Sequence, residues 1–259
     1  MKAPSLYIEF LGTGTSAGVP MIGCDCVVCA STDAADKRLR SSILVQSANT
    51  TLVVDTTPDF RYQMLRADVK KLDAVVFTHS HKDHLAGLDD IRAFNYFMKK
   101  EMPLYIDNLT EDVIKREYAY AFSKEKYPGV PQLQLNNISA EKPFIVGDIP
   151  VLPIQVMHSK MPVLGFRFGD FTYITDANYI DESEKEKIKG SQILVLNALR
   201  KEAHQSHFTL DEAVALAKEL NVPKVYFTHI SHQLGLHATI NKELPENMQL
   251  AYDQLSICL

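Results

Sequence analysis

Short apolar runs bounded by turn residues recur along the chain and predict β-strands. The runs at 42–47 and 51–56 are separated by only three residues, Ala48 to Thr50, and predict a hairpin. Other strands are expected at 5–11, 71–79, 149–159, 163–168, 171–176, 192–197 and 224–229. Apolar residues recur every three to four positions elsewhere, which predicts helices at 58–69, 88–100, 110–122 and 209–220.

The order of these elements indicates an α/β fold. Strands come in groups with helices between the groups, which favours two sheets flanked by helices. Thr209 and Glu212 form a sequence capping box at the start of the last helix. Pro and Gly interrupt the segment 123–142, and we expect 101–142 to be an inserted excursion within one domain that spans 1–259.

Composition narrows the functional classes. The 259 residues are 46% hydrophobic, which suits one large α/β domain, and the formal net charge is -5. Without a basic stripe, tight binding to long nucleic acid is not favoured. No apolar run approaches the ~20 residues of a membrane helix, and the N-terminal residues show no signal-peptide pattern. We therefore expect a cytoplasmic protein that binds neither a membrane nor long nucleic acid.

The sequence FTHSHKDHLAGL at 77–88 places four metal-ligand side chains directly after a buried strand: His79, His81, Asp83 and His84. Imidazole and carboxylate groups bind zinc, manganese or iron. Their spacing directs His79 and His81 to one side of the loop. Asp83 and His84 then turn toward another side. One short loop can therefore contribute ligands to two metal ions.

Four ligands cannot complete two metal sites, so further ligands are required. Three candidates also follow predicted strands, namely His158, Asp176 and His229. A single His or Asp after a strand is usually only a turn residue, and each candidate alone is a weak signal. Together with the loop they supply five histidines and two aspartates, which favours a two-metal centre.

Three cysteines, Cys24, Cys26 and Cys29, lie close together in the chain. Cys24 and Cys26 are badly placed to form a disulfide with each other, and a redox dithiol at Cys26 and Cys29 leaves Cys24 unexplained. Three thiolates and one further ligand would form a tetrahedral zinc site. The fourth ligand is either Cys258 or His232, and we favour His232 because it follows His229 by three residues.

The signature H-x-H-x-D-H at 79–84 resembles that of the metallo-β-lactamase superfamily, and the later His, Asp and His follow in the order of that family. The resemblance implies a four-layer αββα sandwich with two catalytic divalent ions, Zn or Mn. It also implies the distribution of the ligands. The first ion would bind His79, His81 and His158, the second would bind Asp83, His84 and His229, and Asp176 would bridge them.

Further motifs, LGTGTSAGVPMIGCDCVVC, MHSK, HFTL and FTHISHQ, resemble the branch that contains the phosphoribosyl 1,2-cyclic phosphate phosphodiesterases. This resemblance implies one structural Zn, bound by the three cysteines and His232, in a loop at about 12–40. It also implies that His207 is a catalytic acid. Lys160 is a candidate phosphate contact, and a solvated role is equally compatible with its position. His204 and His237 have no expected role.

The expected function is hydrolysis of a small phosphodiester, such as a cyclic sugar phosphate. A water activated between the two ions attacks phosphorus, Asp83 orients it, and His207 protonates the leaving oxygen. The alternatives are a ribonuclease Z-like nuclease, a thioester or lactone hydrolase, and, in another class, a non-hydrolytic cofactor-biosynthesis accessory or redox metalloprotein. The expected partner is the small substrate, and a homodimer is left open.

Overall fold

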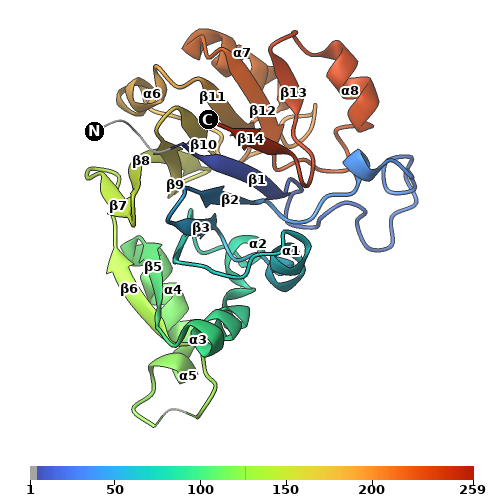
Figure 1. Cartoon of the computed structure of the whole chain (residues 1–259). Helices are drawn as coiled ribbons and strands as arrows, with labels where there is room; N and C mark the ends of the chain where they lie inside the picture. The colour runs from blue at the N-terminus through green and yellow to red at the C-terminus, as the bar shows by residue number, and fades with distance from the viewer. Residues whose placement is uncertain (1–4, 126) are drawn as a thin grey trace.

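The computed structural model describes residues 5–125 and 127–259, which form two facing β-sheets with helices on the outer faces (Figure 1). The first sheet has the strand order β14-β1-β2-β3-β4-β5-β6. Its strands are β1 Tyr7–Gly12, β2 Ser42–Gln46, β3 Thr51–Val54, β4 Ala74–Val76, β5 Met102–Ile106, β6 Leu133–Asn137 and β14 Ser256–Cys258. β2 and β3 form the expected antiparallel hairpin, and β3 to β6 run parallel.

The second sheet has the order β13-β12-β11-β10-β9-β8-β7. Its strands are β7 Phe144–Val146, β8 Ile149–His158, β9 Met161–Phe168, β10 Phe171–Tyr173, β11 Ile193–Asn197, β12 Lys224–Thr228 and β13 Met248–Leu250. β10 to β13 run parallel, whereas β7 to β10 are joined by antiparallel pairs. Parallel strands align their carboxyl ends, and the loops that follow them therefore meet at one edge.

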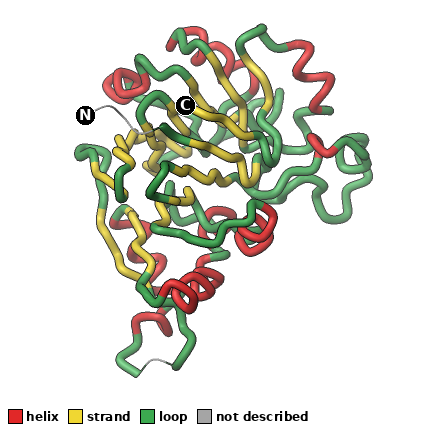
Figure 2. The backbone as a smooth tube through the Cα atoms, viewed as in Figure 1, coloured by secondary structure: helices red, strands yellow, loops and turns green. Residues whose placement is uncertain are grey.

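Helices follow many of the strands and cover the outside of each sheet (Figures 1 and 2). Those after strands of the first sheet are α1 Phe60–Arg66, α2 Lys82–Leu85, η2 Leu88–Ile91, α3 Arg92–Met98, α4 Asn108–Glu117 and α5 Ala119–Phe122. Those of the second half are α6 Glu182–Ile188, α7 Leu210–Leu220 and α8 His237–Glu243. The long connection between β1 and β2 is mostly loop, with one short helix, η1 Ala34–Asp36.

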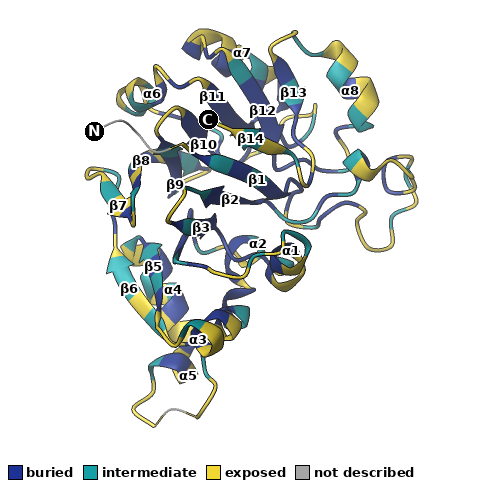
Figure 3. Ribbon diagram, in the orientation of Figure 1, coloured by how far each residue is buried: buried dark blue, intermediate teal, exposed yellow. Residues whose placement is uncertain are grey.

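Strand alternation explains why the fold has four layers. In β4, Ala74 and Val76 enter the apolar cluster between the sheets, whereas Val75 packs beneath the helices of the first half. In β11, Val195 faces the other sheet, whereas Leu194 packs against α7 residues such as Leu216. Both faces of these strands are buried, as Figure 3 shows for β11, so their sequences are mostly apolar. The expected αββα sandwich is confirmed.

The segment 101–142 differs from the expected excursion. It supplies β5 and β6, which extend the first sheet in parallel, together with α4 and α5 on its outer face. The strand signal was weak because Pro103 interrupts β5 and because β6, at the edge of the sheet, has no fully buried residue. Residue 126 of this segment lies outside the described residues.

Several other boundaries also differ from the expectation. The strand expected at 71–79 is regular only at Ala74–Val76, because the residues after it turn into the loop that carries the histidines. The helix expected at 110–122 is interrupted at Tyr118 and forms α4 and α5. The helices α6 and α8 and the three-residue strands β7, β13 and β14 were not expected. Among the described residues, no helix is both long and apolar enough to cross a membrane.

The capping box of α7 is formed as predicted. The Thr209 hydroxyl accepts a hydrogen bond from the Glu212 backbone N–H, and the Glu212 carboxylate accepts one from the Thr209 N–H. We expect Thr209→Ala to lower the free energy of unfolding by about 1 kcal/mol, because an N–H of the first turn loses its acceptor. Urea unfolding measures this loss. Thr209→Ser retains the hydroxyl and should unfold like the parent; an equal loss in both variants would contradict the capping role.

Candidate metal centre

The predicted ligands lie where strands end at one edge of the sandwich. His79 and His81 follow β4, and Asp83 and His84 lie in the short helix α2 after them. The remaining three candidates follow strands of the second sheet: His158 ends β8, Asp176 follows β10 and His229 follows β12. The edge of the sandwich thus brings together residues from both halves of the chain.

These side chains form two groups, each with ligand atoms within 4.8 Å of one another. The first group contains His79, His81, His158 and Asp176, and the second contains Asp83, His84, Asp176 and His229. Asp176 belongs to both groups, as the bridging role requires. The structure therefore brings all seven predicted residues together in two groups that share Asp176.

Two buried nitrogens indicate that a cation belongs between these residues. His79 Nε2 and His84 Nε2 are both buried and make no hydrogen bond within the described part of the chain. Oxygens of the Asp176 carboxylate lie 3.9 and 3.3 Å from them. Because unpartnered buried polar atoms are costly, and because imidazole and carboxylate suit divalent zinc or manganese, the residues present fit a metal pair.

The second ring nitrogen of three ligands is held by a neighbour. His79 Nδ1 lies 2.9 Å from the Thr78 hydroxyl, and His84 Nδ1 lies 2.7 Å from the Asp55 carboxylate. His158 Nδ1 lies 2.9 Å from the carbonyl oxygen of Ser206. Such contacts fix the orientation of a ring and leave Nε2 to face the metal.

Asp55 is a functional residue that the sequence reasoning missed. It is fully buried, and its carboxylate accepts hydrogen bonds from the Thr78 N–H and hydroxyl as well as contacting His84. The sequence contains the pattern that could have identified it, because Asp55 follows strand β3 just as Asp176 follows β10. Asp55, Asp176 and His229 all have φ between 53° and 68°, a left-handed conformation that is unusual for residues other than glycine.

Burial and neighbouring charges set the protonation of the centre. Burial lowers the pKa of His229 to about 3 and holds that of His79 well below its usual value. Although burial opposes ionisation of Asp176, the adjacent His229 and His84 hold the pKa of its carboxyl well below the usual range. At neutral pH His79 and His229 are neutral imidazoles and Asp176 is ionised, the forms that bind metal. His84 differs, because although burial opposes its charged form, the surrounding carboxylates hold its pKa well above the usual value.

His207 also lies at this centre but outside both ligand groups. Its Nε2 is 3.2 Å from an Asp176 carboxylate oxygen, and its ring stacks on that of His229 with centroids 4.9 Å apart. The residue precedes α7 and lies beside the carboxylate that both ligand groups share. Lys160, by contrast, is exposed in the turn after β8 and makes no hydrogen bond or ion pair with the described residues.

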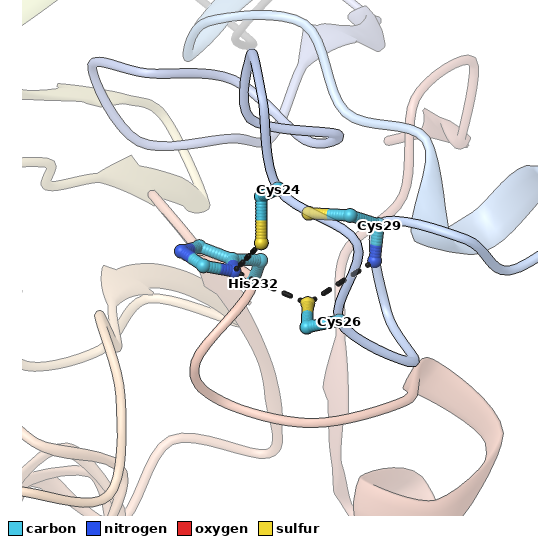
Figure 4. Close-up of side chains that lie close together, drawn as sticks. All are labelled: Cys24, Cys26, Cys29 and His232. Atoms are coloured by element: carbon cyan, nitrogen blue, oxygen red, sulfur yellow. Dashed lines mark hydrogen bonds between the residues drawn. The ribbon is translucent and has the colours of Figure 1, made fainter.

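The three cysteines and His232 form a separate cluster (Figure 4). His232 Nδ1 lies 3.4 Å from Cys24 Sγ and 3.3 Å from Cys26 Sγ. Hydrogen bonds from the Cys29 N–H and His232 lower the pKa of the Cys26 thiol to about 6. Cys258 is exposed in β14, outside the cluster. Of the two candidates for the fourth ligand, His232 is the one that meets the thiols.

We predict that Cys24→Ser loses one zinc ion per chain while the ions at the histidine centre remain. A hydroxyl is a poor substitute for a thiolate ligand, so the four-ligand site loses most of its affinity. Elemental analysis of purified protein measures the loss, and Cys258→Ser is the matched control with unchanged content. Zinc loss from Cys258→Ser but not from His232→Ala would contradict this ligand set.

Comparison with known proteins adds to this geometry. A family described as a β-lactamase superfamily domain matches residues 50–230. A crystal structure of a diphosphatase from the PhnP family has a TM-score of 0.92 and 40% identity, and the alignment covers 98% of this chain and 97% of that one. The zinc-bound PqqB structure from Methylobacterium extorquens has a TM-score of 0.77 at 18% identity, over 98% and 100% of the two chains, and shows the fold alone.

Curated relatives carry different names. An octanoyltransferase from Porphyromonas gingivalis is 38% identical over 95% of this chain, yet the match spans only 50% of the relative. A ribonuclease Z from Listeria monocytogenes is 25% identical over 96% of this chain and 97% of its own length. The family match and the near-full-length likeness to the PhnP-family diphosphatase agree: the chain belongs to the metallo-β-lactamase superfamily and is PhnP-like.

Proposed function

We propose that the protein is a metal-dependent hydrolase that cleaves a phosphorus–oxygen bond in a small phosphodiester. The observation that carries this proposal is the pair of ligand groups that share Asp176, with the His207 side chain beside them. The similarity to a PhnP-family diphosphatase supports chemistry at phosphorus. The formal net charge of -5 favours a small substrate over long nucleic acid.

The ligand sets divide between two divalent ions, zinc or manganese. The first ion would be held by His79, His81 and His158, the second by Asp83, His84 and His229, and Asp176 would contact both. When bound, such a pair activates water for attack and neutralises the negative charge that develops on the phosphoryl oxygens. Hydrogen bonds from the imidazole rings to Thr78, Asp55 and Ser206 keep these rings in place for this task.

Residues of the chain supply orientation and a proton. Asp83 remains partly accessible, with 12% of its side chain exposed, and the neighbouring His84 keeps its pKa low despite burial. Its carboxylate therefore accepts a hydrogen bond from the attacking water and orients it. His207 directs Nε2 toward Asp176 and donates a proton to the departing oxygen.

The cysteine cluster would hold a structural zinc that ties two loops together. The three thiols lie in the loop after β1, and His232 lies in the loop that also carries His229. The same two loops meet again where the Thr15 hydroxyl lies 3.2 Å from His229 Nε2. Zinc at the cysteines would therefore support a catalytic ligand from a distance.

A panel of substrates on metal-reconstituted protein tests the proposal. It contains cyclic sugar phosphates, linear alkyl and nitrophenyl phosphodiesters, diphosphate diesters and an octanoyl thioester. The last two follow from the names of the diphosphatase and octanoyltransferase relatives. We expect turnover of at least one phosphodiester and none of the thioester. Hydrolysis of the thioester with every phosphorus substrate left intact would overturn the proposal.

A further inference from the structure

We infer that His204 is a positioning residue that holds His207 with its Nε2 toward the metal centre. The inference rests on the proposed function, because it assigns a partner to the proposed proton donor. The two histidines belong to the sequence HQSH at 204–207, directly before the N-terminus of α7. His207 is buried, whereas His204 is partly exposed at the protein surface.

The Nδ1 atoms of the two rings face each other. His204 Nδ1 lies 3.2 Å from His207 Nδ1, and the ring centroids are 5.0 Å apart. The hydroxyl of Ser206 lies beside both, at 3.3 Å from His204 Nδ1 and 3.1 Å from His207 Nδ1. Two facing ring nitrogens attract each other only when one carries a proton and the other offers a lone pair.

The backbone shows which nitrogen carries that proton. The Ser206 backbone N–H donates a hydrogen bond to His204 Nδ1 over 3.4 Å. A backbone N–H is always a donor, so His204 Nδ1 must be the acceptor and its own proton belongs on Nε2. The proton between the rings therefore belongs to His207 Nδ1, which donates a hydrogen bond to His204 Nδ1.

This arrangement leaves one nitrogen of His207 for chemistry. With Nδ1–H engaged by His204, the ring can exchange a proton with a substrate only through Nε2, which faces Asp176 at 3.2 Å. It acts as the acid in its imidazolium form, in which both nitrogens carry a proton, and it keeps the Nδ1 proton after Nε2 has given up its own. A histidine acid or base that a third group orients through its other nitrogen is a recurrent catalytic arrangement. His204 would have this orienting role.

The same loop also orients a predicted metal ligand. The carbonyl oxygen of Ser206 accepts a hydrogen bond from His158 Nδ1 over 2.9 Å, while the amide of Ser206 contacts His204. The rings of His158 and His207 are themselves edge to face, with centroids 4.6 Å apart. One short loop therefore sets the positions of a ligand, the proton donor and its partner together.

Two substitutions at His204 separate its role as a hydrogen-bond acceptor from the space that its side chain fills. Asparagine places its Oδ1 close to where histidine has Nδ1, so His204→Asn keeps an acceptor for His207, whereas His204→Leu removes it. For an alkyl phosphodiester, which needs a proton on departure, we expect kcat/KM to fall about 10- to 100-fold in His204→Leu, the range for loss of an orienting partner. We expect His204→Asn to retain most activity and a nitrophenyl diester to be little affected in either variant.

Gln205→Leu is the matched control, because Gln205 is an exposed neighbour whose side chain makes no hydrogen bond with the described residues. It should behave like the parent on both substrates. Equal losses on the alkyl and nitrophenyl substrates in His204→Leu, or failure of His204→Asn to rescue, would overturn the inference.

A measurement without turnover tests the same contact. Long-range ¹H–¹⁵N spectra of the zinc-loaded protein should show a protonated Nδ1 on His207 in the parent and in His204→Asn, and a loss of this preference in His204→Leu. An unprotonated His207 Nδ1 in the parent would overturn the inference. If no phosphodiester is hydrolysed but the expected spectra are found, the proposed function fails while the contact between His204 and His207 stands.

Discussion

Asp176→Asn should abolish hydrolysis of every phosphodiester, with a fall in kcat/KM of roughly 10⁴-fold or more, the scale for removing a catalytic unit as a whole. Asp176 is the one residue shared by both ligand groups, and its carboxylate lies 3.0 to 3.3 Å from nitrogens of three histidines. A neutral amide cannot bridge two divalent cations in the same way. Asparagine tolerates the left-handed backbone at this position, where φ is 53°, so the substitution isolates the charge.

Elemental analysis should show that this variant loses the ions at the histidine centre and keeps zinc at the cysteines. Asp68→Asn is a suitable control, because Asp68 is exposed, has a similar left-handed φ of 51° and lies outside both ligand groups. It should retain metal and activity. Full occupancy of both catalytic ions in Asp176→Asn would show that the bridging assignment is wrong.

His207→Ala should lose activity according to the leaving group. An alkyl phosphodiester releases an alkoxide that must be protonated, and we expect its kcat/KM to fall about 10²- to 10⁴-fold, the range for general acid catalysis. A nitrophenolate departs without a proton, so a nitrophenyl diester should lose little. The ring of His207 lies outside both ligand groups, so the metal content should be unchanged.

The ratio of the two losses is the informative quantity. Asp83→Ala provides the contrast, because orientation of the attacking water matters for both substrates and the losses should be similar. Equal losses for the two substrates in His207→Ala would assign this residue to substrate binding instead of proton donation. No loss with either would leave His207 without a role in catalysis.

The sequence predicted the metal centre better than it predicted the supporting contacts. The six positions from His79 to His84 contain four candidate ligands, and the other three candidates follow apolar strands, so their chemistry is visible locally. Asp55 and Ser206 act instead through contacts with His84 and His158, 29 and 48 residues away along the chain. Neither has a motif of its own, and only the folded arrangement of loops shows what each orients.

The fold was predictable where strands are buried on both faces and less so at the margins. β11 and β12 are apolar at their centres and lie inside the second sheet, so their existence and position were clear from the sequence. Four strands lie at the edges of the sheets: β6, β7, β13 and β14. Edge strands that are short or partly exposed show little alternation of apolar and polar residues. The helices α6 and α8 are single seven-residue segments with one buried side chain each, too few to create a visible period.

The cysteine cluster has a consequence for the order of events during synthesis. Cys24 and His232 are separated by 208 residues, so three thiols leave the ribosome long before the fourth side chain exists. At about 5–20 residues per second, that interval is roughly 10–40 s. During this time the thiols are free to meet oxidants or the wrong metal, and the cluster cannot close until β12 and the loop after it have joined the second sheet. Loading of the proposed zinc site would therefore depend on zinc supply and on thiol-protecting conditions late in synthesis, and not only on the affinity of the finished site.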